Sequence, residues 1–243
     1  PAGKEALGNT KMRVVVVWCL LRECLASCPW PEPWQDLAEL EPEARRVALV
    51  VRGIAFRDCG HGRACDAAGK EATLACAESQ VERFVASVEA AGFVVDVLVA
   101  SYECPGATEE WLLTYDAEAA SLPEASRAAE ESQLDSLRRG LGLIRRRYAG
   151  VLVARSDLYF VSDLASLVDE PRLMFHADMS DGALYRTGGA PVVVENVTTT
   201  TDKLFWIPGP HLPCFLEAVE AGDCFRSGDD DDDPRWISGE SCF

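Results

Sequence analysis

Arginine residues occur directly after two short apolar runs of this sequence. The first place holds Arg52-Gly53 and, shortly after, Arg57; the second holds Arg155-Ser156-Asp157. A guanidinium beside a glycine turn suits a pyrophosphate or a carboxylate, which it can hold through two parallel hydrogen bonds. A third apolar run ends at the polar pair Ser101-Tyr102. The first chemistry that the sequence suggests is therefore recognition of such an anion.

The composition argues against several classes of protein. With 243 residues, 48% of them hydrophobic, the chain has the size of one ordinary globular domain. The 23 lysines and arginines are outnumbered by 40 aspartates and glutamates, and the net charge of -17 opposes binding to nucleic acid. Neither the dinucleotide glycine triplet nor the GK[ST] phosphate loop occurs, which argues against Rossmann dehydrogenases and P-loop kinases.

The apolar runs and the segments between them predict the elements that must position these residues. Buried strands are expected at Arg46 to Arg52, Phe93 to Ala100 and Val151 to Ala154, because their apolar runs are rich in β-branched residues. Helical spacing of apolar residues predicts the helices that separate them. These span Glu71 to Ala91, Thr108 to Ala120, and Leu134 to Tyr148. Strand, helix and strand in alternation indicate an α/β fold with a mixed, mainly parallel sheet flanked by helices.

The half of the chain beyond Asp163 has a less regular pattern. Its expected elements are short strands at Arg172 to Phe175, Pro191 to Glu195 and Lys203 to Ile207, and a helix near His211 to Ala221. In open α/β sheets, ligands bind at the carboxyl ends of the strands. We therefore expect the largest pocket at that edge of the sheet. Its expected lining is Arg52, Gly53, Ser101, Tyr102 and Asp157.

Several of these segments, taken in order, match a known pattern over roughly Arg46 to Ala221. They are Val50 to Gly53 with Phe56-Arg57, Ala100 to Tyr102, Gln133 with Ser136-Leu137, Arg155 to Phe160, and Asp202 to Pro208. In these segments the chain resembles glycosyltransferases of the GT-A type, which are nucleotide-sugar enzymes with a Rossmann-like sheet, and particularly their algal and viral-type members. The resemblance implies a nucleotide-sugar donor and a carbohydrate or glycoconjugate acceptor.

The resemblance also implies roles for individual residues. The nucleotide would contact the first two strand ends and the turn after the third. The residues concerned are Arg52, Gly53, Arg57, Ser101, Tyr102, Arg155 and Asp157. Asp157 lies where such enzymes contact ribose or a divalent metal, Mn or Mg. The positive charge of the metal would offset the negative charge of the leaving group. Tyr159 stands where the usual Asp-x-Asp pair has its second aspartate, so Arg155 could instead stabilise the diphosphate directly. The alternative for Asp157 is a cap of a short helix after Ser162.

Two aspartates are candidates for the catalytic base. Asp202 begins an aromatic segment on the expected acceptor side, and Asp181 lies in a polar segment with Asp178. A carboxylate there could orient a sugar hydroxyl or accept its proton. The alternative for each is an ordinary turn aspartate.

Residues 1–45 are interpreted as an N-terminal extension, signal-like or poorly ordered, and residues 46–243 as one catalytic domain that ends before a later metal-binding histidine. The run Val14 to Leu21 is too short to cross a bilayer and could also be a buried strand, so no transmembrane segment is expected. Ten cysteines and the sequon Asn196-Val197-Thr198 favour the secretory pathway, in the Golgi or ER lumen, with a cytoplasmic location as the alternative.

These observations favour a glycosyltransferase. The first alternative is a non-catalytic nucleotide- or carbohydrate-binding module on the same scaffold, because the metal pair is reduced to one aspartate. A secreted, disulfide-rich interaction protein would explain the cysteines but not the buried strands and arginine turns.

Overall fold

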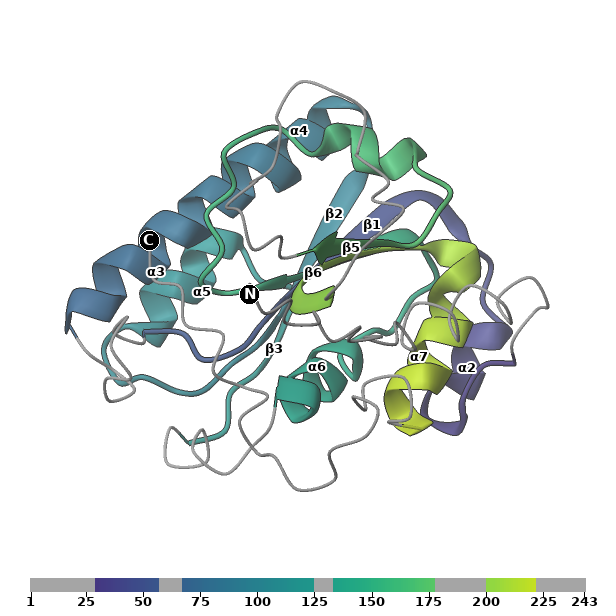
Figure 1. Cartoon of the computed structure of the whole chain (residues 1–243), viewed down its shortest axis with the longest axis horizontal. Coiled ribbons are helices and arrows are strands. Elements are labelled where there is room, and N and C mark those ends of the chain that lie inside the picture. The colour runs from purple at the N-terminus through teal and green to yellow at the C-terminus, as the bar shows by residue number, and fades with distance from the viewer. Residues whose placement is uncertain (1–28, 57–66, 125–132, 178–199, 222–243) are drawn as a thin grey trace, which may run out of the picture.

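A computed structural model describes residues 29–56, 67–124, 133–177 and 200–221, and within them six strands form one sheet (Figure 1). The strand order is β3-β2-β1-β4-β6-β5. The strands are β1 (Glu43–Arg52), β2 (Val94–Ala100), β3 (Ala119–Ser121), β4 (Tyr148–Arg155), β5 (Met174–Ala177) and β6 (Thr200–Pro208). The pairs among β1 to β4 are parallel, and β6 runs antiparallel to both its neighbours. The predicted α/β class with a mixed, mainly parallel sheet is confirmed.

The three predicted strands lie side by side at the centre of this sheet. All residues from Val47 to Val51 are fully buried, as are those from Val151 to Ala154. Continuous apolar runs of this kind are typical of strands covered on both faces. The register aligns Arg52 of β1 with Ala100 of β2 and with Arg155 of β4. The carboxyl ends of the three strands therefore meet at one edge.

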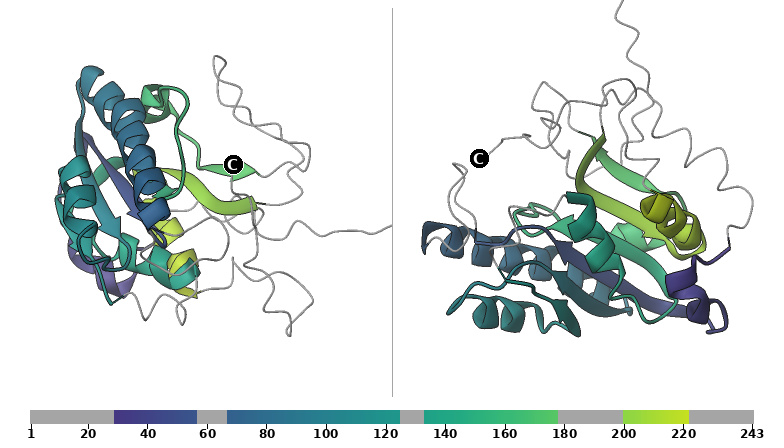
Figure 2. Two further views of the ribbon diagram at one scale, coloured as in Figure 1. Left: turned by 90° about the vertical axis from the view of Figure 1, so that its left-hand side faces the viewer. Right: turned by 90° about the horizontal axis from the view of Figure 1, so that it is seen from below.

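Helices cover both faces of the sheet (Figure 2). On one face, α3 (Ala67–Gln80), the π-helical segment η2 (Val81–Val85) and α4 (Ala86–Ala90) follow one another without a break and pack with α5 (Thr108–Tyr115). The other face carries the remaining helices. These are α6 (Gln133–Leu141), α7 (Leu212–Ala221) and α2 (Gln35–Ala38), with the short 3-10 turn η1 (Glu32–Trp34). Two further 3-10 turns are η4 (Ala165–Asp169) and η5 (Gly209–His211).

Two of the predicted helices are shorter than expected. The helix predicted to reach Ala120 ends at Tyr115, where Asp116 adopts a left-handed conformation, and Ala119 and Ala120 belong to β3. The helix predicted to reach Tyr148 ends at Leu141. Apolar residues of a helix, a turn and a strand share the same spacing here, because all of them point into one core. The strand predicted at Pro191 to Glu195 lies outside the described residues.

The boundary expected after residue 45 falls inside β1, and the packed fold includes residues before it. Trp34 and Leu37 are buried, and the Trp34 indole Nε1 donates to the Leu141 carbonyl oxygen at 3.3 Å. The signal-like run and the sequon lie outside the described residues.

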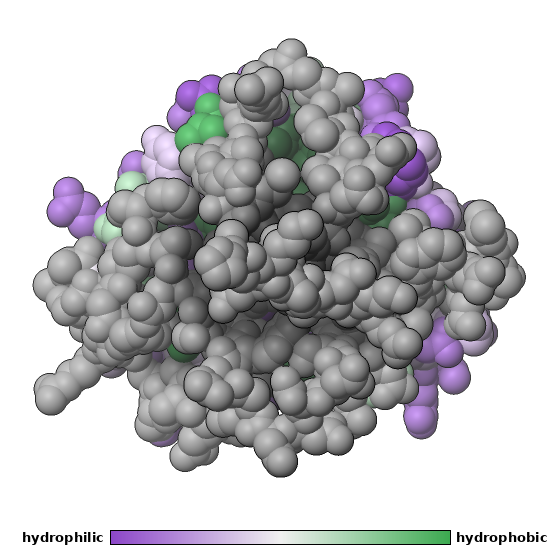
Figure 3. All heavy atoms as spheres, in the orientation of Figure 1, coloured by the Kyte–Doolittle hydropathy of each residue, from purple (hydrophilic) through white to green (hydrophobic). Residues whose placement is uncertain are grey.

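Among the helices within the described ranges, none has the length and apolar character needed to cross a bilayer. Hydrophilic side chains line the rim of the described surface in Figure 3.

Candidate functional site

Backbone hydrogen bonds join the carboxyl ends of β1, β2 and β4. The Gly53 N–H donates to the Ala100 carbonyl oxygen at 3.1 Å, and the Ser156 N–H donates to that of Arg52 at 2.8 Å. The Ser101 hydroxyl accepts the Ala55 N–H at 3.1 Å. Gly53 has a φ of 107°, a backbone conformation that residues other than glycine rarely adopt. These bonds bring Arg52, Gly53 and Ser101, with the adjacent Tyr102, to one edge of the sheet.

Arg52 lies beneath helix α6. Its side chain is fully buried, and its Nη1 donates to the Ser136 hydroxyl at 3.3 Å. Helix α6 approaches the sheet closely because Gly140 has no side chain; a Cβ there would lie 2.7 Å from the Val50 Cγ1 atom. The close approach holds the first turn of α6 over the end of β1.

Arg139 is a second arginine of the same helix at this edge. Its Nη1 donates to the Ser101 carbonyl oxygen at 3.1 Å, and its guanidinium lies 4.7 Å from the centre of the Tyr102 ring. A guanidinium in this position makes a cation–π contact with a buried aromatic ring. No role for Arg139 was predicted from the sequence. Its spacing of three residues from Ser136 was the signal that could have found it.

Arg155 and Asp157 form an ion pair after β4. Two hydrogen bonds join the guanidinium to the carboxylate, Nε to Oδ1 at 2.9 Å and Nη2 to Oδ2 at 2.5 Å. The Arg155 side chain is mostly buried, whereas that of Asp157 is 54% exposed. Asp157 therefore lies at the same edge as Arg52, and its carboxylate holds Arg155 in a fixed orientation.

The described residues do not fit the metal that the resemblance implies. Asp157 supplies one carboxylate, which Arg155 already engages through both oxygens. In the described parts of the chain, no three His, Cys, Asp or Glu side chains gather closely enough to hold a metal ion. The arrangement fits recognition of an anion by arginine better than coordination of a cation.

Of the two candidates for the catalytic base, only Asp202 lies within the described residues. Asp202 belongs to β6, and the pairing of Leu204 with Ala154 sets its backbone beside the carboxyl end of β4. Asp181 and Arg57 lie outside the described residues. Asp202 is thus at the edge where the arginines meet.

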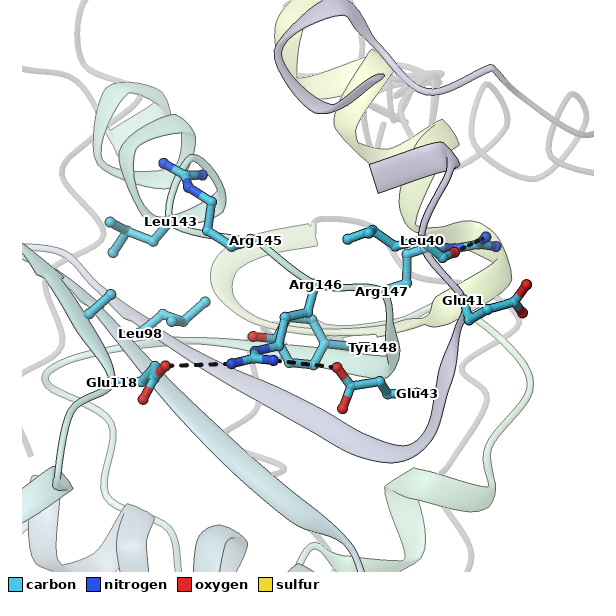
Figure 4. Close-up of a pocket in the computed structure, with 11 residues that line it drawn as sticks. Leu40, Glu41, Glu43, Leu98, Glu118, Leu143, Arg145, Arg146, Arg147 and Tyr148 are labelled. Carbon is cyan, nitrogen blue, oxygen red and sulfur yellow. Dashed lines mark hydrogen bonds and ion pairs between the residues drawn. The ribbon is translucent and has the colours of Figure 1, made fainter. Parts of the chain in front are cut away.

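A cavity of about 560 Å³ lies at the opposite, amino edge of the sheet. Figure 4 shows the residues that line it. A second cavity, of about 510 Å³, borders the end of α5. Neither is lined by Arg52, Gly53, Ser101, Tyr102 or Asp157, so neither is the pocket predicted at the carboxyl edge.

A network of ion pairs lies at the same edge of the sheet as this cavity. The buried Asp96 carboxylate accepts hydrogen bonds from Arg46 at 2.6 Å and from the Tyr148 hydroxyl at 2.9 Å. Burial, and then the charge of Asp96, raises the pKa of Tyr148 well above its usual range. Arg146 lies 3.5 Å from Asp96. It also lies 3.6 Å from Glu43 and 3.9 Å from Glu118 (Figure 4). Arginine at this end is matched by carboxylates.

Comparison with known proteins found no family model that matches the chain and no curated protein that matches its sequence.

Proposed function

We propose that this chain is a glycosyltransferase that moves a sugar from a nucleotide diphosphate sugar to a glycan, lipid or protein acceptor. The observation that carries the proposal is the convergence of Arg52, Arg139 and Arg155 on one edge of a parallel sheet, in a chain with a net charge of -17. A nucleotide diphosphate gains negative charge as the glycosidic bond breaks. Guanidinium groups that are already oriented stabilise that charge without reorganisation.

Each part of the edge has a role in this proposal. The first two strand ends, with Gly53, Ser101 and Tyr102, contact the nucleotide, and Arg155 contacts the diphosphate while Asp157 orients it. Asp202, whose backbone lies beside the end of β4, is the base that accepts the proton of the acceptor hydroxyl. Arg57 and Asp181 keep their proposed roles, in nucleotide binding and proton transfer.

A second candidate is a non-catalytic nucleotide- or carbohydrate-binding module. The observation that favours it is the closed Arg155–Asp157 pair, in which both carboxylate oxygens are engaged. A module of this kind would bind a nucleotide sugar and leave its glycosidic bond intact.

We further propose that the chain works in the secretory pathway, in the lumen of the Golgi or ER. Cys104 and Cys214 are both disulfide-bonded, and disulfide bonds persist chiefly in oxidising compartments.

A thermal-shift panel tests the proposal and separates the two candidates. UDP, GDP and CMP are each added with and without manganese, because a ligand that binds only the folded state raises the melting temperature. We expect one nucleotide to raise the melting temperature. In a second assay, the chain should release the sugar from the corresponding nucleotide sugar, by transfer or by hydrolysis. A shift without release would favour the binding module. No shift with any of the three nucleotides would contradict both candidates.

A further inference from the structure

The turn that carries Arg155 and Asp157 is held from beneath by Gln80, the last residue of α3. Gln80 is fully buried. Its amide Nε2 donates one hydrogen bond to the Arg155 carbonyl oxygen at 3.0 Å and another to that of Leu158 at 2.7 Å. These two bonds bracket Ser156 and Asp157, so the side chain of one helix residue fixes both ends of the turn.

Tyr115 of α5 completes the hydrogen bonding of this amide. Its hydroxyl lies 2.7 Å from the Gln80 Oε1 atom and donates to it. Carbonyl oxygens only accept, so the amide nitrogen must face the turn and its oxygen must face Tyr115. Burial, followed by the charge of nearby Cys76, raises the pKa of Tyr115 well above its usual value, which keeps this hydroxyl protonated. The orientation of the Gln80 amide is therefore fixed on both sides.

The helix around Gln80 makes two more contacts with the loop that follows β4. The Ser79 hydroxyl accepts the Phe160 N–H at 3.0 Å, and the Arg83 carbonyl oxygen accepts the Leu164 N–H at 2.8 Å. Arg83 lies in η2, whose π-helical turns begin directly after Gln80. Short π-helical segments inside α-helices occur frequently at functional sites. The loop is thus held at three points along one helix.

We propose that Gln80, supported by Tyr115, is a positioning residue that sets Arg155 and Asp157 in place for the ligand of the carboxyl edge. The identity of that ligand, a nucleotide diphosphate, rests on the proposed function. The positioning of the turn itself does not. Gln80 contacts only backbone atoms of the turn in the bonds described above, so it acts through the turn and not on the ligand.

Hydrogen exchange tests the positioning directly. Gln80→Met keeps the length of the side chain and removes its three hydrogen bonds. We expect the amides of Ser156, Leu158 and Phe160 to exchange at least about tenfold faster in this variant, because the turn opens locally. The control is Trp34→Phe, which removes a buried hydrogen bond on the other face of the sheet and should leave these amides unchanged. Unchanged exchange in folded Gln80→Met would overturn the proposal.

Nucleotide affinity tests the consequence for the site. We expect Gln80→Met to weaken the binding of UDP, or of the nucleotide that the panel selects, by about tenfold, and Tyr115→Phe to weaken it less. In an Arg155→Met, Asp157→Asn background, Gln80→Met should change the affinity by less than about twofold, because the groups it positions are absent. An equal loss in both backgrounds would show that Gln80 acts only on general stability. If the unmodified chain binds no nucleotide, the proposed function fails, and the exchange measurement still decides the role of Gln80.

Discussion

The two edges of the central strands use arginine in different ways. At the amino edge, Arg46 and Arg146 contact the carboxylates of Glu43, Asp96 and Glu118. These groups form one network across the starts of β1, β2 and β4. The charges of the arginines and carboxylates offset one another there, and the network serves the packing of the strands.

At the carboxyl edge, Arg155 pairs with Asp157, and two further arginines contact neutral oxygens. Arg52 donates to the hydroxyl of Ser136, and Arg139 donates to the carbonyl oxygen of Ser101. Such contacts fix the orientation of a guanidinium. In the proposed function, the arginines of the carboxyl edge bind the ligand, whereas those of the amino edge hold the starts of the strands together.

The largest effect on stability is expected at the amino edge. Asp96→Asn removes the buried carboxylate that Arg46, Arg146 and the Tyr148 hydroxyl contact, and should lower the free energy of unfolding by about 3 kcal/mol. Urea unfolding measures the loss. The affinity for nucleotide should stay the same under conditions where the variant is folded. A loss of affinity in the folded variant would show that the two edges are not separate in function.

The largest effect on activity is expected at Asp157. Asp157→Asn removes the charge that holds Arg155, and should lower transfer or hydrolysis of the sugar nucleotide by about a hundredfold. The melting temperature should fall by only a few degrees, because the carboxylate is partly exposed. The control is Asp163→Asn, which breaks an exposed pair with Arg83. Transfer at the unmodified rate in folded Asp157→Asn would make Asp157 an ordinary turn residue.

A smaller effect on binding is expected at Arg139. Arg139→Met should weaken nucleotide binding by about tenfold, measured by calorimetry, because one oriented guanidinium is lost. The neighbouring Arg138 provides a matched control. Its guanidinium donates to the carbonyl oxygens of Val219 and Glu220 at the end of α7, so Arg138→Met should leave the affinity unchanged. Equal losses in the two variants would remove the distinction between them.

The smallest effect is expected from a pair outside both edges. Hydrogen bonds from Arg172 lower the pKa of Glu170. A lowered pKa contributes stability at neutral pH, and this contribution is lost as the pH falls through the folded-state pKa. Glu170→Gln should therefore lower the melting temperature slightly near neutral pH and have no effect in strong acid. A difference that stays constant down to strong acid would contradict this assignment.

The central strands could be predicted from the sequence because continuous apolar runs are typical of strands buried on both faces of a sheet. The runs Val47 to Val51 and Val151 to Ala154 predict their own burial and, through the carboxyl-end rule, the edge where a ligand is expected. The exact end of α6 could not be predicted, since Ile144 and Tyr148 continue its apolar spacing from a turn and a strand. The role of Gln80 could not be predicted either, because neither its burial nor its hydrogen-bond partners follow from the sequence pattern.

The proposed binding of nucleotide at the carboxyl edge is tested most directly by mapping amide chemical shifts during a nucleotide titration of the labelled chain. The amides of Gly53, Ser101 and Ser156 should shift in proportion to occupancy, whereas those of Glu43 and Arg146 at the amino edge should not. Shifts confined to the amino edge, or to the cavity that Arg146 lines, would contradict the assignment of the site to the carboxyl ends of the strands.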